Sequence, residues 1–273
     1  MLVIKIGGGA GIGADAFACF AADIATFTEP IVVVHGGNAE FSRLSERLCI
    51  PPQIVTSSTG RVTRYTDAET MDAMLMAYCG KVNKRLVAAM HSAGVNAVGL
   101  SAMDGGVAVG KRKPVLRGEI DGRAKVFRDD HAGTIEEIDS TLIRTLMDAG
   151  FVVLITPPAL SHEGVPINVD GDKLAQKLAE SLGADGLLFF SDTPGLLADR
   201  HDESTLIRAI DAGNPESALA AAEGRMVVKV EQAVKAVERG VGQVIFSDGR
   251  AERPITRALT GEGTVVREEP VTA

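Results

Sequence analysis

Short apolar runs rich in β-branched residues recur along the chain, and longer stretches with helical spacing separate them. The runs cover residues 2–6, 31–35, 95–99, 151–155, 186–190 and 243–246. Apolar strands that alternate with helices are typical of a mostly parallel sheet with helices on its faces. The pattern therefore predicts an α/β fold, a three-layer sandwich around a mostly parallel central sheet.

Helix signals fill the intervals between these runs. Residues Thr66-Asp67-Ala68-Glu69 match a capping box, and the proline-free stretch that follows predicts a long helix ending near Gly94. Leucines at 174, 178 and 182 form an apolar stripe that Gly183 should end. Further helices are expected from Asn214-Pro215 and over residues 231–239, and a loose tail is expected from about Arg267.

Hairpin signals interrupt the alternation in two places. Asp104-Gly105 and Asp121-Gly122 predict hairpin turns between short strands within residues 104–128. Pro157-Pro158 and the later Glu163-Gly164 predict another hairpin before Asn168. We place a boundary near residues 168–172, which divides the chain into an N-lobe of residues 1–168 and a C-lobe of residues 169–273.

Composition narrows the class of protein. The chain has 273 residues, of which 45% are hydrophobic, and no apolar run approaches the ~18 residues of a membrane span. The first residues already resemble a strand, so no signal peptide is expected. Cys19, Cys49 and Cys79 form no CxxC pair, which disfavours a disulfide framework or a zinc site. We expect buried thiols and a cytoplasmic location without a membrane partner.

The charge is distributed unevenly. A net charge of −8 argues against a nucleic-acid partner. Seven basic and two acidic residues between positions 111 and 128 give this segment +5 and leave −13 for the remainder. A basic segment on an acidic body would steer an acidic partner to one place.

Glycine-rich turns follow the first two apolar strands. Residues 2–6 lead into Gly7-Gly8, and residues 31–34 lead through His35 into Gly36-Gly37. Consecutive glycines after a strand expose backbone N–H groups that can bind phosphate, and Lys5 lies on the strand that feeds the first turn. Residues 105–111 match most of the P-loop pattern GxxxxGK(S/T), but Arg112 occupies the position that requires Ser or Thr. No GxGxxG pattern is present, which disfavours a dinucleotide-binding site.

Further polar groups occur where an α/β sheet exposes its loops. Residues 168–172 bring one amide and two carboxylates to a hairpin-to-helix junction, and residues 191–196 follow a strand. Lys229 lies at a helix start, and Arg64 precedes the capping box.

With these motifs in this order, the chain resembles the amino acid kinase family. The acetylglutamate kinase branch matches over nearly the whole length, at residues 5–8, 35–37, 64–67, 168–172, 191–195 and 226–229. The resemblance implies the carbamate kinase-like fold and an ATP-dependent phosphorylation of a carboxylate. Asp170 departs from the Asn that is often found at this point in the branch.

Several further stretches resemble a carrier-dependent subgroup of this branch. They are residues 58–60, 78–86, 110–113 and 156–160. The subgroup phosphorylates 2-aminoadipate or glutamate joined through its amino group to a small acidic carrier protein, for lysine or for arginine and ornithine biosynthesis. The basic segment agrees with an acidic protein substrate, and its candidate docking residues are Lys111, Arg112, Lys113 and Arg117.

The resemblance also assigns roles to residues. Lys5 and Lys229 would neutralise the phosphoryl oxygens, with Asp172 between them. Arg64 and Asn168 would bind the acyl substrate. Glycine N–H groups would hold the phosphate, and the substrate would also contact the second glycine turn; these glycines are Gly7, Gly8, Gly36 and Gly37. The nucleotide would contact Ser191, Asp192, Gly195, Leu196 and Met226.

The resemblance implies ATP with Mg²⁺ bridging its phosphates, no metal ligand supplied directly by the protein, and a homodimer. A reductase would consume the acyl phosphate. Two other functions remain open. One is an acetylglutamate kinase that acts on the free acid, and the other is a non-catalytic sensor of ATP or an amino acid. An aspartokinase is disfavoured because fewer than fifty residues follow Lys229.

Overall fold

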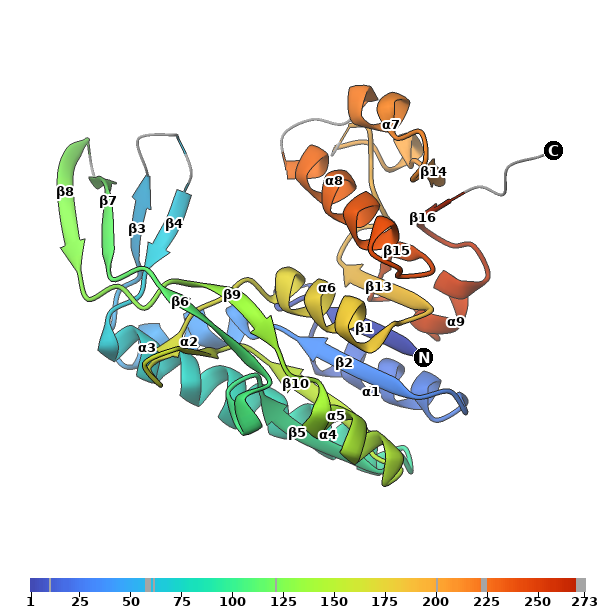
Figure 1. Ribbon diagram of the computed structural model, residues 1–273, viewed down its shortest axis with the longest axis horizontal. Coiled ribbons are helices and arrows are strands. Elements are labelled where there is room, and N and C mark those ends of the chain that lie inside the picture. Colours follow the sequence, from blue (N-terminus) through green and yellow to red (C-terminus); the bar gives the residue numbers. More distant parts are fainter. Residues whose placement is uncertain are drawn as a thin grey trace.

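A mostly parallel eight-stranded sheet forms the centre of the molecule (Figure 1), in the order β14-β16-β15-β13-β1-β2-β10-β5. The computed structural model describes residues 1–9, 11–56, 60, 62–120, 122–199, 201–221 and 225–268. All neighbouring strands are parallel except β15 and β16. The strands are β1 (Leu2–Ile6), β2 (Ile31–His35), β5 (Ala97–Ser101), β10 (Val152–Thr156), β13 (Gly186–Ser191), β14 (Ala209–Asp211), β15 (Val244–Asp248) and β16 (Thr264–Arg267).

Helices cover both faces of this sheet, which confirms the predicted three-layer sandwich. One apolar layer lies beneath α5 (Thr141–Asp148), α6 (Gly171–Leu182) and α8 (Arg225–Glu238), and α7 (Glu216–Ala221) packs on α8. The opposite layer lies beneath α1 (Ala14–Ile24), α4 (Asn83–Ser92) and α9 (Pro254–Leu259). None of the described helices is long and apolar enough to cross a membrane.

Alternation along β1 determines where its lysine lies. Leu2, Ile4 and Ile6 belong to the apolar layer of α1, whereas Val3 belongs to the layer of α6. Because side chains two residues apart share a face of a strand, Lys5 lies on the α6 side. The strand pattern therefore brings Lys5 beneath the N-terminal end of α6.

Two smaller sheets extend the N-terminal half of the molecule. One has the order β12-β11-β6-β9, and the other, β4-β3-β7-β8, rises on the left of Figure 1; we call the latter the arm. The first is built from β6 (Ala108–Arg112), β9 (Gly133–Ile138), β11 (Ala159–Ser161) and β12 (Pro166–Ile167). The arm is built from β3 (Gln53–Thr56), β4 (Val62–Tyr65), β7 (Val115–Ile120) and β8 (Arg123–Arg128).

The long helix expected before Gly94 is present in three sections. These are α3 (Ala68–Leu75), a π-helical segment η1 (Met76–Val82) and α4. The N-cap is Asp67, whose side chain accepts from the Thr70 N–H, and not Thr66 as the capping box predicted. The Thr66 N–H instead donates to the carboxylate of Asp130 at 3.0 Å, so a tertiary contact overrides the local pattern.

Some local expectations are corrected. Asp104-Gly105 does not turn a hairpin: residues 104–106 form a 3₁₀ turn (η2), and β6 pairs with β9 and β11. The β7–β8 hairpin is present, although Asp121 at its turn lies outside the described residues, and β11–β12 confirms the later hairpin. The cysteines carry no disulfide, yet Cys49 is exposed.

The observed ends of the helices and of the C-terminal strand agree only in part with the predicted ends. The helix expected over residues 231–239 is longer and begins at Arg225, and Gly183 ends α6 in the left-handed conformation as predicted. Strand β16 continues to Arg267, and the end of the expected tail, residues 269–273, lies outside the described residues. The α2 helix (Asn38–Arg47) begins directly after the second glycine turn.

Candidate active site

The two glycine turns lie against each other at the carboxyl ends of β1 and β2; we call Gly7-Gly8 and Gly36-Gly37 the glycine nest. A Cβ atom on Gly8 would lie 2.5 Å from the Gly37 nitrogen, and one on Gly36 would lie 2.9 Å from the Gly8 Cα. Side chains at these positions would push the turns apart, so glycine is required by the close approach of two backbones.

Two of the four glycine N–H groups already have main-chain partners. The Gly7 N–H donates to the Phe190 carbonyl at 2.9 Å, and the Gly36 N–H donates to the Ile6 carbonyl at 3.1 Å. These bonds extend the parallel sheet by one residue. Within the described ranges, the Gly8 N–H has no main-chain partner, and the Gly37 N–H faces the Tyr78 hydroxyl. The Gly8 N–H is therefore the donor most available to a ligand, and the Gly37 N–H could donate to one only in exchange for the Tyr78 hydroxyl.

Lys5 and Asp172 form an ion pair beside this nest. The Lys5 Nζ lies 2.9 Å from the Asp172 Oδ1, and the side chains are 10% and 40% exposed. Burial raises the pKa of Asp172, but the Lys5 ammonium and the more distant Lys229 outweigh it and leave this pKa below its ordinary value. The carboxylate therefore stays charged and holds Lys5 in place.

Asp172 reaches this position because Asp170 begins α6. The Asp170 Oδ1 accepts from the N–H groups of Asp172 and Lys173 at 2.8 and 3.0 Å, as an N-cap side chain does. The departure from Asn at position 170 therefore preserves the acceptor that starts the helix.

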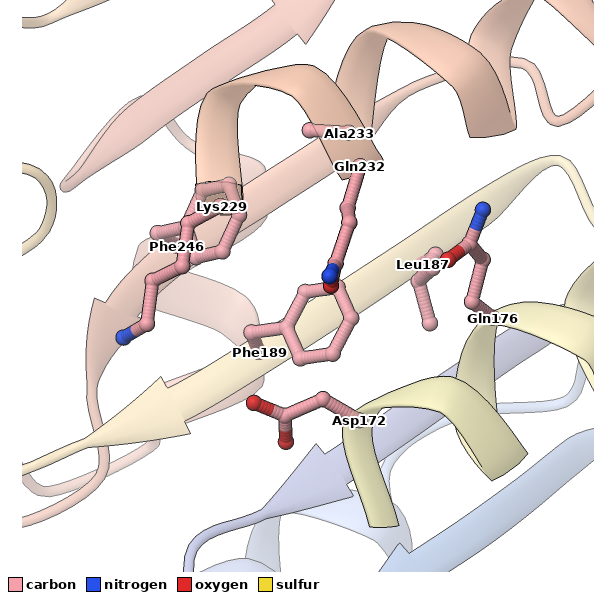
Figure 2. A pocket seen from close by; sticks show the side chains of 8 residues that line it. All are labelled: Asp172, Gln176, Leu187, Phe189, Lys229, Gln232, Ala233 and Phe246. Atoms are coloured by element: carbon pink, nitrogen blue, oxygen red, sulfur yellow. The ribbon is translucent and has the colours of Figure 1, made fainter. Parts of the chain in front are cut away.

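Lys229 lies across a small pocket from Asp172. Figure 2 shows Asp172 from α6 and Lys229 from α8 on either side of it. The Phe189 and Phe246 rings, stacked with centroids 5.2 Å apart, contribute to its lining, and the Lys229 Nζ lies 6.0 Å from the Phe246 centroid. Lys229 is the fifth residue of α8, near the helix start where the sequence analysis expected it.

Arg64 is a half-buried cation without an acidic partner. Its guanidinium carbon lies 4.4 Å from the Phe41 ring centroid, and its Nη2 donates to the Asn38 Oδ1 at 3.3 Å. Its buried Nε has no hydrogen-bond partner in the described part of the chain, and burial lowers its pKa. None of the ion pairs between described residues involves Arg64. Such a group is suited to an anionic ligand.

Asn168 is oriented by Thr66. The Asn168 Nδ2 donates to the Thr66 Oγ1 at 3.2 Å, and the Thr66 hydroxyl in turn donates to the Arg64 carbonyl at 3.5 Å. This order of donors directs the Asn168 Oδ1, an acceptor, away from Thr66. Asp130 fixes the same region through the Thr66 N–H.

The loop after β13 contains residues that were expected to contact the nucleotide, and some of them are exposed whereas others are buried. Asp192 is exposed, and the Ser191 and Thr193 hydroxyls lie 3.0 Å apart. Leu196 is 4% exposed and belongs to the core, and its N–H is not available to a ligand because it donates to the Thr264 Oγ1 at 2.9 Å. Gly195 is closely packed against Leu206 and Thr264. Met226 lies in the first turn of α8, and its side chain is outside the described residues.

The predicted docking residues do not share one element. Lys111 and Arg112 lie in β6, outside the arm, and the Arg112 Nε donates to the Asp130 carbonyl at 2.9 Å. Lys113 is exposed between β6 and β7, and Arg117 is exposed on β7 of the arm.

Three side chains around Arg64 were not expected from the sequence. They are Asn38, Phe41 and Tyr78, which all contact Arg64 or the glycine nest. The adjacency of Asn38 to Gly37 was a usable signal, but nothing local in the sequence relates Tyr78 to either turn. His35, for which no catalytic role was expected, is fully buried.

His35 supports the second glycine turn from inside. Its Nδ1 lies 3.0 Å from the Gly36 carbonyl, and its Nε2 lies 2.9 Å from the Asn83 Nδ2. A carbonyl can only accept, so Nδ1 carries the proton and Nε2 accepts. Burial lowers the pKa of His35 from 6.5 to about 4. The ring is therefore neutral at physiological pH.

Comparison with known proteins relates the whole chain to kinases. The model of the amino acid kinase family matches residues 1–248. LysW-aminoadipate kinase of Deinococcus radiodurans is 48% identical over 266 residues, 97% of this chain and 91% of the relative. The Thermus thermophilus enzyme of the same name is 46% identical over 98% of this chain and 100% of its own. Acetylglutamate kinase of Methanopyrus kandleri is 35% identical over 90% of this chain and 94% of its own.

Solved structures share the fold. N-acetylglutamate synthase from Neisseria gonorrhoeae, complexed with coenzyme A and N-acetyl-glutamate, matches with a TM-score of 0.76 and 27% identity over 98% of this chain and 59% of its own. A carbamate kinase from Giardia has a TM-score of 0.66 and 16% identity over 98% of both chains. The carbamate kinase-like fold expected from the sequence is thereby confirmed.

Proposed function

The chain belongs to the amino acid kinase family, and from this premise we propose that it phosphorylates a carrier-bound amino acid with ATP. The acceptor is the side-chain carboxylate of 2-aminoadipate, or of glutamate, joined through its amino group to a small acidic carrier protein. The names of the two relatives at 46 and 48% identity support this substrate. The product is an acyl phosphate for lysine biosynthesis, or for arginine and ornithine biosynthesis, which a reductase consumes.

The observation that carries the proposal is the Lys5–Asp172 ion pair beside the glycine nest, together with Lys229, which lines the same pocket as Asp172. A carboxylate attacks phosphorus without losing a proton, so this reaction needs no general base. Its main obstacle is repulsion between two anions, and catalysis therefore consists of positioning and charge neutralisation.

The chain's own groups divide this work. Lys5 and Lys229 approach the transferred phosphoryl group from opposite sides, and Asp172 keeps Lys5 oriented. The Gly8 and Gly37 N–H groups donate to the phosphoryl oxygens. These donors are fixed before the substrate arrives, so little reorganisation is required during transfer.

The acceptor is bound by its other functional groups. Arg64 presents an unpartnered Nε and pairs with the α-carboxylate, which removes the cost of its burial. The Asn168 Oδ1 accepts from the amide N–H that links the amino acid to the carrier. Both groups suit an N-acylated amino acid.

ATP with Mg²⁺ supplies the phosphoryl group. The two lysines and the glycine donors fit the charge of a triphosphate, and Mg²⁺ bound to the phosphates adds further neutralisation. Among the described residues, no cluster of His, Cys, Asp and Glu forms a site for a metal ion. Ser191, Asp192, Gly195 and Met226 lie on the C-lobe elements that flank the nucleoside, and Leu196 supports them from the core.

The arm offers a docking face for the carrier. Cross-strand pairs share a face of a sheet, and the pairs in the arm place three arginines, Arg64, Arg117 and Arg128, on the same side with one acid, Glu119. That side also carries four exposed aliphatic residues: Ile54, Val62, Val115 and Val126. A face that combines exposed apolar groups with cations, continuous with Arg64, suits a small acidic protein. Lys111, Lys113 and, in part, Arg112 extend it at the base.

The proposal also covers the division of work between the two lobes, the homodimer and the cellular location. Residues 1–168 bind the acyl substrate and form a homodimer, and residues 169–273 bind ATP; the β1–β13 pairing joins these lobes in one sheet. The reaction takes place in the cytoplasm.

A hydroxylamine trap tests the proposal, because acyl phosphates react with hydroxylamine to give coloured hydroxamates. The purified protein is supplied with Mg-ATP and one of three acceptors: carrier-linked aminoadipate, carrier-linked glutamate or free N-acetylglutamate. We expect hydroxamate with a carrier-linked acceptor. Turnover of the free acid alone would identify an acetylglutamate kinase, and no turnover with any acceptor would agree with a sensor.

A further inference from the structure

One oxygen atom joins three elements beside the glycine nest. The Asn38 Oδ1 accepts from the Arg64 Nη2 at 3.3 Å and lies 3.4 Å from the Tyr78 hydroxyl. Asn38 is the first residue of α2 and follows Gly37 directly. Burial raises the pKa of Tyr78, so its hydroxyl keeps its proton and can donate. Asn38 therefore connects Arg64 on the arm with Tyr78 in η1.

Tyr78 also packs directly on the nest. A Cβ atom on Gly37 would lie 2.7 Å from the Tyr78 Cδ2, and Tyr78 is only 7% exposed. It belongs to an apolar cluster with Phe41, whose ring lies beneath the Arg64 guanidinium. The ring of Tyr78 thus supports Gly37, while its hydroxyl contacts the residue that holds Arg64.

This arrangement fixes the separation of two anion sites. The reacting carboxylate of an acceptor lies at the nest, and its other carboxylate pairs with Arg64. The Asn38 side chain links Arg64 to the nest, because it bonds to Arg64 and directly follows Gly37. We propose that Asn38 and Tyr78 are positioning residues that set this separation and thereby select the length of the acyl acceptor. The inference rests on the proposed function.

The selection concerns a single methylene group. Aminoadipate and glutamate differ by one methylene, which a rigid site discriminates by about 10- to 200-fold. A guanidinium that loses its bond to Asn38 can shift to meet a shorter or longer acceptor. Loss of the Asn38 or Tyr78 contact should therefore lower discrimination between the two acceptors.

The experiment compares both carrier-linked acceptors in Tyr78→Phe and Asn38→Ala. Ser42→Ala is the matched control, because the Ser42 hydroxyl donates to the Asn38 main-chain carbonyl on the same helix and not to its side chain. For the preferred acceptor we expect KM to rise about 3- to 10-fold, with the KM for ATP unchanged. The ratio of kcat/KM between acceptors should fall by at least about threefold.

Two results would overturn the inference. The first is an acceptor ratio equal to the wild type in both folded variants. The second is an equal rise in the KM values for ATP and acceptor with a fall in kcat, which would show damage to the nest alone. If the wild type used only the free acid, the proposed function would fail. The same comparison between N-acetylglutamate and N-acetyl-2-aminoadipate would then decide the role of Asn38 and Tyr78.

Discussion

The Lys5 ammonium lies 2.9 Å from the Asp172 carboxylate, although the two residues are 167 positions apart in the sequence. Because side chains alternate between the two faces of β1, Lys5 lies on the α6 side of the sheet. The Asp170 N-cap begins α6 close to Lys5. The pair places a fixed cation beside the glycine nest. In the proposed mechanism this cation must stay in place, which requires an ionised Asp172; the lowered pKa of Asp172 keeps that carboxylate ionised.

A double-mutant cycle measures this dependence. Lys5→Met should lower kcat about 10²- to 10³-fold, as expected for loss of one preorganised donor. Asp172→Asn should also lower kcat, because Lys5 loses its orienting partner. The double variant should be little worse than Lys5→Met alone, since the residues act as a unit. Strict additivity in steady-state assays would show that Asp172 does not act through Lys5.

Lys229→Met tests the second cation. We expect kcat to fall about 10²- to 10³-fold, because Lys229 faces the site from α8 across from Asp172. Lys235→Met is the control, since Lys235 is exposed on the same helix and lies away from the pocket. Near-normal turnover in Lys229→Met would remove Lys229 from the catalytic assignment.

Charge reversal on the arm tests carrier docking. Arg117→Glu should raise the KM for the carrier-linked acceptor and flatten its increase with salt, while kcat changes little. Arg208→Glu makes the same charge change at an exposed position far from the arm in sequence. The triple reversal of Lys111, Arg112 and Lys113 is less specific, because Arg112 bonds to Asp130. Identical salt profiles in Arg117→Glu and Arg208→Glu would contradict docking on this face.

The buried His35 should make stability depend on pH. Its pKa is about 4 in the folded state and 6.5 in the ordinary state, so only the unfolded chain binds a proton between these values. The free energy of unfolding should fall by about 3 kcal/mol as pH decreases from 6.5 toward 4. Urea unfolding of His35→Gln should lose this slope, whereas His162→Gln, at an exposed histidine, should keep it. An unchanged slope in His35→Gln would be inconsistent with a neutral buried ring.

Asp23 should stabilise the fold at a distance from the site. Its buried carboxylate, from α1, accepts from the Ile255 and Thr256 N–H groups of α9 at 2.8 and 2.9 Å. Asp23→Ala would leave these donors without a partner and should cost about 2–4 kcal/mol. The exposed Asp15→Ala on α1 should cost under about 1 kcal/mol. A loss below 1 kcal/mol for Asp23→Ala in urea unfolding would contradict this capping role.

The sequence was sufficient for the parts of the fold that depend on local pattern. The apolar runs predicted the strands of the sheet. The glycine turns, together with Lys5, Asp172 and Lys229, predicted the centre of the candidate site. Local patterns gave wrong predictions where a contact with a residue far away in the sequence determines the structure. Thr66 matches an N-cap, but Asp130 takes its N–H, and Asp104-Gly105 matches a hairpin turn although β6 pairs with β9.

The missed site residues have the same explanation. Asn38 and Tyr78 are 40 positions apart, and Asn38 and Arg64 are 26 apart. No periodicity or spacing rule relates such positions, because their contact arises from how the arm, α2 and η1 pack. Asp23 is a stronger example, since it caps a helix that begins more than 230 residues later.

The central claim is that two lysines neutralise the transferred phosphoryl group from opposite sides. A crystal structure with MgADP, aluminium fluoride and the acceptor tests it most directly. The account predicts the Lys5 and Lys229 ammonium groups within about 3 Å of fluorides on opposite sides of the aluminium, with Gly8 and Gly37 N–H groups donating to the same mimic. An occupied complex in which either ammonium group points away from the mimic would contradict it.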